Sequence, residues 1–228
     1  MIFLILAIVV GAVYWQQTLP RCSDGTVYDQ CSGNKPLFCN NGTLERRVSL
    51  CGCPNLDYIR QDGEQCLDLR HPDVSKLEKR IHEIINENRV ENGLTELEWN
   101  QQIAEVARNH SQDMAERNYF SHESPEGYDF TWRYAEGNVI CAIQLGDMIY
   151  GGAENIHKGG VYGTIHYTNG IETSRDYKTL EEIAQDVATG WMNSPGHRAN
   201  ILTPYWQTEG LGVAVTSDGA VYSTENFC

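Results

Sequence analysis

Cysteines constrain the first part of this chain more than any other residue type. Six of the eight cysteines fall between positions 22 and 66, where turn pairs such as Asp24-Gly25 and Asn41-Gly42 recur and few apolar residues remain to form a core. Disulfides stabilise such a segment by restricting the unfolded chain. A zinc site is disfavoured, because the segment has neither a Cys-x-x-Cys pair nor a histidine. The six residues are Cys22, Cys31, Cys39, Cys51, Cys53 and Cys66.

The sequence leaves the pairing among these six open, because many connectivities satisfy the same spacing. A single glycine separates Cys51 from Cys53, which disfavours a bridge between them, so each is expected to pair with an earlier cysteine. Cys141 and Cys228 are then left for each other. That disulfide would tie the C-terminus to the irregular region around Cys141.

An uncharged apolar run, Met1–Trp15, begins the sequence. As a helix it spans about 22 Å, against roughly 30 Å for the hydrocarbon core of a bilayer, and it reaches Leu19 only through polar residues. Neither a preceding Lys or Arg nor a clear cleavage site is present, so a membrane anchor is favoured over a cleaved signal peptide. Disulfides need an oxidising compartment. The remainder is therefore expected on the extracellular face of the membrane, or secreted if the run is cleaved.

Three segments follow from these patterns. We expect a membrane anchor or signal segment over 1–19, a disulfide-rich module over 20–70 and a larger domain over 71–228, which begins at His71-Pro72-Asp73. The formal net charge of −14 offers no basic stripe for phosphates, which excludes a nucleic-acid partner. The expected partners are the membrane, through the N-terminal segment, and a cell-surface or extracellular ligand.

Hydrophobic periodicity predicts an α+β architecture for the larger domain. Apolar residues three and four positions apart predict helices, and two alternating runs around Ser217-Asp218-Gly219 predict a hairpin. Thr179 and Glu182 form a capping box at the start of the third helix, and Asn92-Gly93 ends the first. The predicted elements are helices over 74–85, 99–114 and 180–191 and a β-hairpin over 211–227. Helices precede strands without βαβ alternation, which is typical of an α+β fold.

The rest of this domain has less pattern. No sustained period runs from Tyr128 to Tyr177, which indicates short helical turns and an insertion over 158–177. His110 lies on the apolar stripe of the second helix. The favoured interpretation is a buried histidine hydrogen-bonded to backbone, with a place in a pocket wall as the alternative.

Three motifs suggest a functional site: Phe120-Ser-His122, Gly151-Gly-Ala-Glu-Asn-Ile156 and Trp191-Met-Asn-Ser-Pro-Gly-His-Arg198. Pro195-Gly196 cannot continue a helix, so we expect His197 on the turn that follows. Turn side chains are placed for contact with ligands more often than those of the core.

Two further motifs accompany these three: Asn109-His-Ser-Gln-Asp-Met114 and the closing Glu225-Asn-Phe-Cys228. Together they resemble the CAP superfamily of cysteine-rich secretory, antigen 5 and pathogenesis-related 1 proteins (the SCP domain). The resemblance is greatest to the microbial branch. The resemblance covers about residues 77–228. It implies an α-β-α sandwich and a cleft with two histidines and two glutamates. His122, Glu154 and His197 match three of these four positions, whereas Ser194 stands where the second glutamate is expected. Glu225 is the alternative carboxylate.

Two imidazoles and a carboxylate suit a divalent cation such as zinc, in a site left open to water. His122, Glu154 and His197 are thus the candidate metal ligands and the candidate catalytic residues. A Ser194–His197 nucleophile is disfavoured, because no acidic partner is identifiable. The expected function is a membrane-anchored extracellular protein that binds a divalent cation, a lipid or a peptide-like ligand. The alternative is a metal-assisted extracellular hydrolase of peptide or cell-wall polymer; without a second carboxylate, binding is favoured over catalysis.

Overall fold

The computed structural model describes residues 19–54, 58–61 and 64–228. It divides into two compact units, one ending at Asp68 and one that runs from Leu69 to Cys228. No helix among the described residues is long and apolar enough to cross a bilayer. Residues 1–18 of the expected anchor lie outside the described residues.

The first unit consists of small hairpins held by three disulfides. Its elements are β1 (Leu37–Asn40), β2 (Thr43–Arg46), α2 (Val48–Cys51), β3 (Tyr58–Gln61) and β4 (Gln65–Asp68). β1 pairs with β2 and β3 with β4, both antiparallel. The disulfides are Cys22–Cys39, Cys31–Cys51 and Cys53–Cys66. Cysteines form much of the small buried interior, as expected of a segment with few apolar side chains.

One expected pairing in this unit is wrong. Cys51 pairs with an earlier cysteine, Cys31, as predicted, but Cys53 pairs forward with Cys66. Cys66 lies on β4, and the β3–β4 hairpin brings its Cα to 5.6 Å from that of Cys53. The prediction is wrong because it considered only the short separation of Cys51 and Cys53 and not the β3–β4 hairpin, which returns the chain to Cys53.

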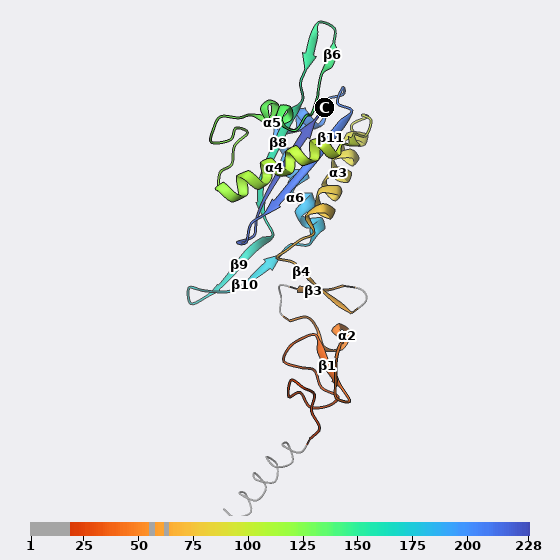
Figure 1. Ribbon diagram of the computed structural model, residues 1–228, viewed down its shortest axis with the longest axis vertical. Helices are drawn as coiled ribbons and strands as arrows, with labels where there is room; N and C mark the ends of the chain where they lie inside the picture. Colours follow the sequence, from red (N-terminus) through yellow and green to blue (C-terminus); the bar gives the residue numbers. More distant parts are fainter. Residues whose placement is uncertain (1–18, 55–57, 62–63) are drawn as a thin grey trace, which may run out of the picture. The chain divides into compact units, whose positions relative to one another are not determined.

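The second unit is a three-layer α-β-α sandwich (Figure 1). Its helices are α3 (Val74–Glu91), α4 (Gln101–Arg117), α5 (Phe130–Glu136), α6 (Leu180–Asn193) and α7 (Pro195–Ile201). Its strands are β5 (Glu98–Trp99), β6 (Ile143–Leu145), β7 (Met148–Tyr150), β8 (Ala153–Gly160), β9 (Tyr162–Thr168), β10 (Ile171–Tyr177), β11 (Thr208–Val215) and β12 (Ala220–Phe227). The central sheet has the order β5-β11-β12-β8, while β6–β7 and β9–β10 form separate hairpins.

The two faces of the sheet have different coverings. Leu211, Val213 and Phe227 pack with α3, α6 and α7 in the main core. The alternate positions Gly210 and Gly212 face α4, whose backbone lies directly against them. The predicted three helices, the capping box at Thr179 and the β11–β12 hairpin are all present. Trp99 belongs to β5 rather than to the second helix, which begins at Gln101.

The Cys141–Cys228 disulfide is present, with Cα atoms 5.5 Å apart, and it closes a separation of 87 residues. We expect the Cys141→Ser, Cys228→Ser double variant to lose about 2–4 kcal/mol of unfolding free energy, because a long loop is no longer restricted in the unfolded chain. Tryptophan fluorescence during urea unfolding measures this, since Trp99, Trp132, Trp191 and Trp206 all lie in the second unit. A midpoint within experimental error of the native chain would contradict it.

Candidate functional site

His122 and Glu154 meet at the end of the sheet that α5 covers. His122 lies in the loop between α4 and α5, and Glu154 is the second residue of β8. The His122 Nδ1 lies 3.0 Å from Glu154 Oε1; the His122 side chain is 50% exposed and the Glu154 side chain 1% exposed. A carboxylate only accepts hydrogen bonds, so the imidazole donates from Nδ1, and in its neutral form it presents Nε2 as an acceptor.

Arg133 of α5 completes this arrangement. Its Nη2 donates to Glu154 Oε1 at 2.9 Å and to Oε2 at 2.7 Å, and its side chain is only 10% exposed. The same nitrogen donates to the backbone carbonyl of His122 at 3.0 Å, and Nη1 donates to that of Tyr128 at 2.9 Å. The guanidinium therefore neutralises Glu154 and holds the loop that carries His122.

Our reading of the sequence missed Arg133, although one signal was available. No other Lys or Arg stands between Arg117 and Lys158, and Arg133 lies on a short helix beside the His122 motif. A single arginine in such a segment is a candidate ion-pair partner for a buried carboxylate, here that of Glu154.

His110 of α4 lies behind the pair. It is 1% exposed, and its Nε2 donates to the Ser121 carbonyl at 3.0 Å, which confirms the prediction of a buried histidine bonded to backbone. Burial lowers the pKa of His110 to about 4, so the ring is neutral at physiological pH. The same nitrogen lies 3.9 Å from Glu154 Oε1. We call His110, His122, Arg133 and Glu154 the Glu154 cluster.

His197 lies near this cluster but is not bonded into it. It is the third residue of α7, so the expected turn is wrong: proline suits the first position of a helix, and Pro195 starts a new one where α6 ends. Burial lowers the pKa of His197, and the charge of His122 lowers it further. Within the described residues, no hydrogen bond or ion pair joins its ring to Glu154 or His122.

The three-residue zinc ligand set expected from the sequence is not assembled. Across residues 19–54, 58–61 and 64–228, no group of three or more His, Cys, Asp or Glu side chains is arranged to hold a metal ion. Arg133 donates to both Glu154 oxygens and adds a positive charge beside them, which disfavours a divalent cation at this carboxylate. The ligand set His122, His197 and Glu154 stays a prediction.

Neither candidate for the fourth position supplies a carboxylate to the cluster. Ser194 lies between α6 and α7, and its side chain makes no capping hydrogen bond. Glu225 is opposite Asn155 in the β12–β8 ladder, whereas Glu154 is opposite Asn226. Adjacent strand positions face opposite sides, so Glu225 points away from Glu154, into the α3–α6 layer.

Glu225 belongs instead to a buried acidic pair. It is fully buried, its Oε2 accepts from Asn155 Nδ2 at 2.8 Å, and Glu209 of β11 lies beside it. Burial raises the pKa of Glu209 to about 7, and burial together with the neighbouring charge of Glu209 raises that of Glu225 well above its usual range. His82 is in contact with Glu209. This pair lies in the core, on the far side of the sheet from the Glu154 cluster.

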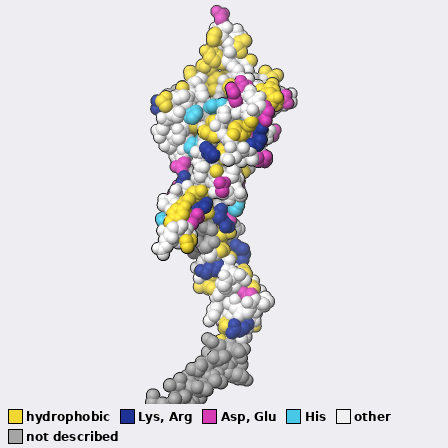
Figure 2. Space-filling model, turned by 90° about the vertical axis from the view of Figure 1, so that its left-hand side faces the viewer, with side chains coloured by type: hydrophobic (Ala, Val, Ile, Leu, Met, Phe, Trp, Pro, Cys, Tyr) yellow, Lys and Arg dark blue, Asp and Glu magenta, His cyan; other side chains and the backbone are white. Residues whose placement is uncertain are grey.

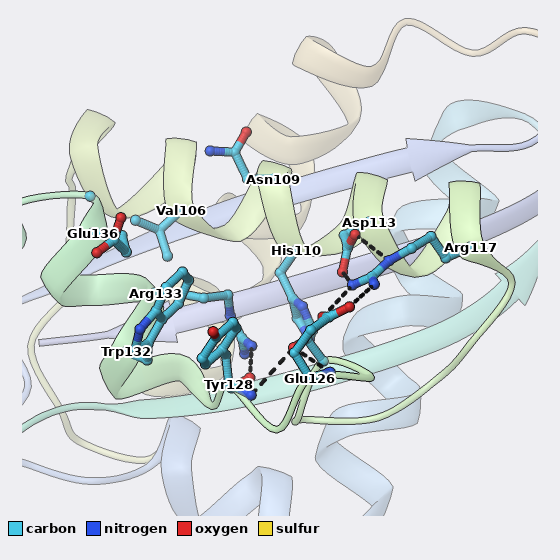
Figure 3. Close-up of a pocket in the computed structure, with 12 residues that line it drawn as sticks. Val106, Asn109, His110, Asp113, Arg117, Glu126, Tyr128, Trp132, Arg133 and Glu136 are labelled. Carbon is cyan, nitrogen blue, oxygen red and sulfur yellow. Dashed lines mark hydrogen bonds and ion pairs between the residues drawn. The ribbon is translucent and has the colours of Figure 1, made fainter.

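A cavity of about 400 Å³ adjoins the cluster (Figure 3). We call it the α4–α5 cavity, because α4, α5 and the loop between them supply its walls, and His110 and Arg133 belong to both features. On the face of this unit shown in Figure 2, histidine side chains reach the surface close to one another. The lining residues are Val106, Asn109, His110, Asp113, Arg117, Ser124, Glu126, Tyr128, Trp132, Arg133, Glu136 and Gly137.

Two bacterial proteins are similar to this chain in sequence. The YkwD protein of Bacillus subtilis is 30% identical over 152 residues, which are 67% of this chain and 47% of that protein. The membrane protein YlbC of the same species is 35% identical over 150 residues, 66% of this chain and 34% of its own. This chain therefore spans less than half the length of either relative.

Two solved structures are also similar to part of this chain. The crystal structure of an extracellular Bacillus anthracis protein that contains an SCP domain is 31% identical, with a TM-score of 0.46, and the match covers 67% of this chain and 40% of that one. A structure of NaASP2 determined with Zn²⁺ is 12% identical, with a TM-score of 0.42, and covers 67% of this chain and 78% of that one. The model of the cysteine-rich secretory protein (CAP) family matches residues 82–227. The chain belongs to the cysteine-rich secretory protein, or CAP, family.

Proposed function

We propose that this chain is an extracellular protein, anchored through residues 1–19, that binds a peptide-like ligand at the Glu154 cluster. The observation that carries the proposal is the pairing of both Glu154 oxygens with Arg133 beside a half-exposed His122. Four disulfides support an oxidising location. An extracellular relative and a membrane-protein relative support the same placement.

Binding is favoured over metal-assisted hydrolysis by the state of Glu154. A general base or metal ligand has to exchange the partners it already holds, and both Glu154 oxygens accept hydrogen bonds from Arg133. Ser194 brings no second carboxylate. The held imidazole of His122 is suited to another task, since its Nε2 can accept a hydrogen bond from a peptide N–H.

A peptide-like ligand is favoured over a lipid by the walls of the adjoining α4–α5 cavity. Five of its side chains are ionisable carboxylates or guanidiniums: Asp113, Arg117, Glu126, Arg133 and Glu136. An acyl chain would desolvate these groups without replacing their hydrogen bonds, which costs free energy. Peptide groups offer both donors and acceptors to them.

We expect the full chain, purified in mild detergent, to bind a fluorescein-labelled pool of mixed-sequence hexapeptides. His122→Ala should lower the affinity at least about tenfold, because a hydrogen bond to a charge-supported group is worth about 1.5 kcal/mol or more. Fluorescence polarisation measures it. His166→Ala is the matched control, because His166 is an exposed histidine on β9 that pairs with Asp176.

Zinc titration by calorimetry tests the competing function on the same samples. Micromolar zinc binding that disappears in both His122→Ala and His197→Ala would contradict a metal-free ligand site. It would then favour the metal-assisted hydrolase.

A further inference from the structure

The α4–α5 cavity has features that the Glu154 cluster does not explain. Its volume of about 400 Å³ lies within the range of small-ligand pockets. One stripe of α4 supplies Val106, Asn109, His110, Asp113 and Arg117, and α5 with the preceding loop supplies the opposite wall. Figure 3 shows the two walls facing each other across the cavity.

An aromatic platform forms part of the second wall. Tyr128 and Trp132 stack with ring centroids 4.0 Å apart and an angle of 10° between the planes. Yet 41% of Tyr128 and 42% of Trp132 remain exposed, although large aromatic side chains gain free energy from burial. A stacked, solvated pair of this kind can cover an aliphatic chain or attract a cation to a ring face.

The charges around the cavity leave an excess of carboxylate. Arg117 lies between Asp113 and Glu126 and bonds to both, and it holds the pKa of each below its usual range. Arg133 is balanced by Glu154, and His110 is neutral. Glu136 has no ionic partner among the described residues. It is the last residue of α5, where the helix dipole disfavours a carboxylate, so it does not serve the helix.

One buried polar group in the walls lacks a partner. Arg133 Nε is buried and makes no hydrogen bond within the described part of the chain, although nine-tenths of the side chain is buried. A buried N–H without an acceptor costs free energy, so a bound oxygen acceptor would stabilise it.

From these features we propose that the α4–α5 cavity binds a lysine or arginine side chain of the peptide-like ligand. Glu136 pairs with the charged end of that side chain, and the Tyr128–Trp132 stack packs against its methylene groups. This inference rests on the proposed function. The peptide carbonyl next to the basic residue supplies the acceptor for Arg133 Nε. The alternative occupant of an aromatic platform, a neutral saccharide, would leave the excess negative charge without a counterpart.

The test uses the full chain in mild detergent and three acetylated, amidated alanine–glycine hexapeptides that differ only at one central residue: lysine, norleucine or glutamate. Norleucine keeps the aliphatic length of lysine without the charge. We expect the lysine peptide to bind about tenfold more tightly than the norleucine peptide, the size of one ion pair with a cation–π contact. In Glu136→Gln the preference should fall below about threefold while norleucine affinity is unchanged.

Asp147→Asn is the matched control, because it removes one carboxylate from the turn between β6 and β7, outside the cavity. It should keep the full lysine preference. Equal affinities for lysine and norleucine peptides in the native chain would overturn the inference, as would a lysine preference that survives Glu136→Gln.

The same samples separate the two proposals. Peptide binding that is lost in His122→Ala but shows no lysine preference would leave the proposed function standing and remove this inference alone. Failure of all three peptides would remove both. Tight binding of a chitin tetrasaccharide, lost in Trp132→Leu, would assign the platform to a saccharide and overturn the inference.

Discussion

Gly212→Ala should destabilise the second unit by about 3 kcal/mol or more, at or above the upper end of what an added group costs in a packed core. A Cβ at this position would lie 2.0 Å from the backbone N of Arg108, 2.2 Å from the carbonyl carbon of Ala107 and 2.4 Å from the Cα of Arg108. All three are backbone atoms of α4, so no rotamer change relieves the overlap. α4 would have to move away from β11.

That movement would also break the polar contacts between α4 and its surroundings. Ser111 donates to the Gly212 carbonyl at 2.8 Å and lies 2.8 Å from the Thr224 hydroxyl. Arg108 donates to Glu78 of α3. His110 lies on the same helix, so its hydrogen bond to Ser121 and its place in the Glu154 cluster would change with it. We therefore expect loss of ligand binding along with loss of stability.

Urea unfolding followed by tryptophan fluorescence measures the effect of Gly212→Ala. The matched control is Gly196→Ala in α7, where no atom lies within 4 Å of the added Cβ. Alanine is the better helix former by about 1 kcal/mol, so this control should be neutral or slightly stabilising. An unfolding free energy of Gly212→Ala within about 1 kcal/mol of the native value would show that α4 has room to move away from β11.

The elements that could be predicted are those whose signals are local. Helix α6 has its capping box at Thr179 and its apolar face within one segment, and α3 has its stop signal at Asn92. The β11–β12 hairpin has its turn between two alternating runs. These signals need no knowledge of the rest of the chain, and the family resemblance added how the layers are arranged.

The features that could not be predicted depend on distant segments. Arg133 neutralises Glu154 across 21 positions, and only the folded loop brings the two together. The Cys53–Cys66 disulfide depends on the β3–β4 hairpin. The face on which Glu225 lies depends on the register of β12 against β8, where a shift of one residue would reverse it. The sequence identified the carboxylate of the expected metal site, Glu154, but not the guanidinium that pairs with it.

The buried acidic pair gives the unit a pH-dependent stability whose direction follows from its pKa values. Glu209 and Glu225 have raised pKa values when folded, about 7 for Glu209 against an ordinary 4.5, so the folded state holds protons that the unfolded state releases. Their contribution is complete below about pH 4.5 and is lost as the pH rises through 7. The groups that face them are His82 and Arg89 of α3 and Asn155 of β8.

Glu225→Gln should remove the larger part of the stability that the native chain loses as the pH rises. Glutamine has the shape of the protonated acid and keeps an acceptor oxygen for Asn155, which donates to Glu225 Oε2 in the native chain. Its amide can donate to Glu209, which no longer faces a second charge. We expect the variant to equal the native chain within about 1 kcal/mol at pH 5 and to exceed its unfolding free energy by roughly 2–4 kcal/mol at pH 8.

Urea unfolding at pH 5, 6, 7 and 8 measures how the unfolding free energy of the native chain and of Glu225→Gln depends on pH. The control is Glu123→Gln, which removes a carboxylate from the exposed loop between α4 and α5 and should follow the native pH dependence. Parallel curves for Glu225→Gln and the native chain would mean that the pair is ionised in the folded state at neutral pH. Convergence at pH 5 with divergence at pH 8 would instead locate the protons in the core, on the face of the sheet opposite the Glu154 cluster.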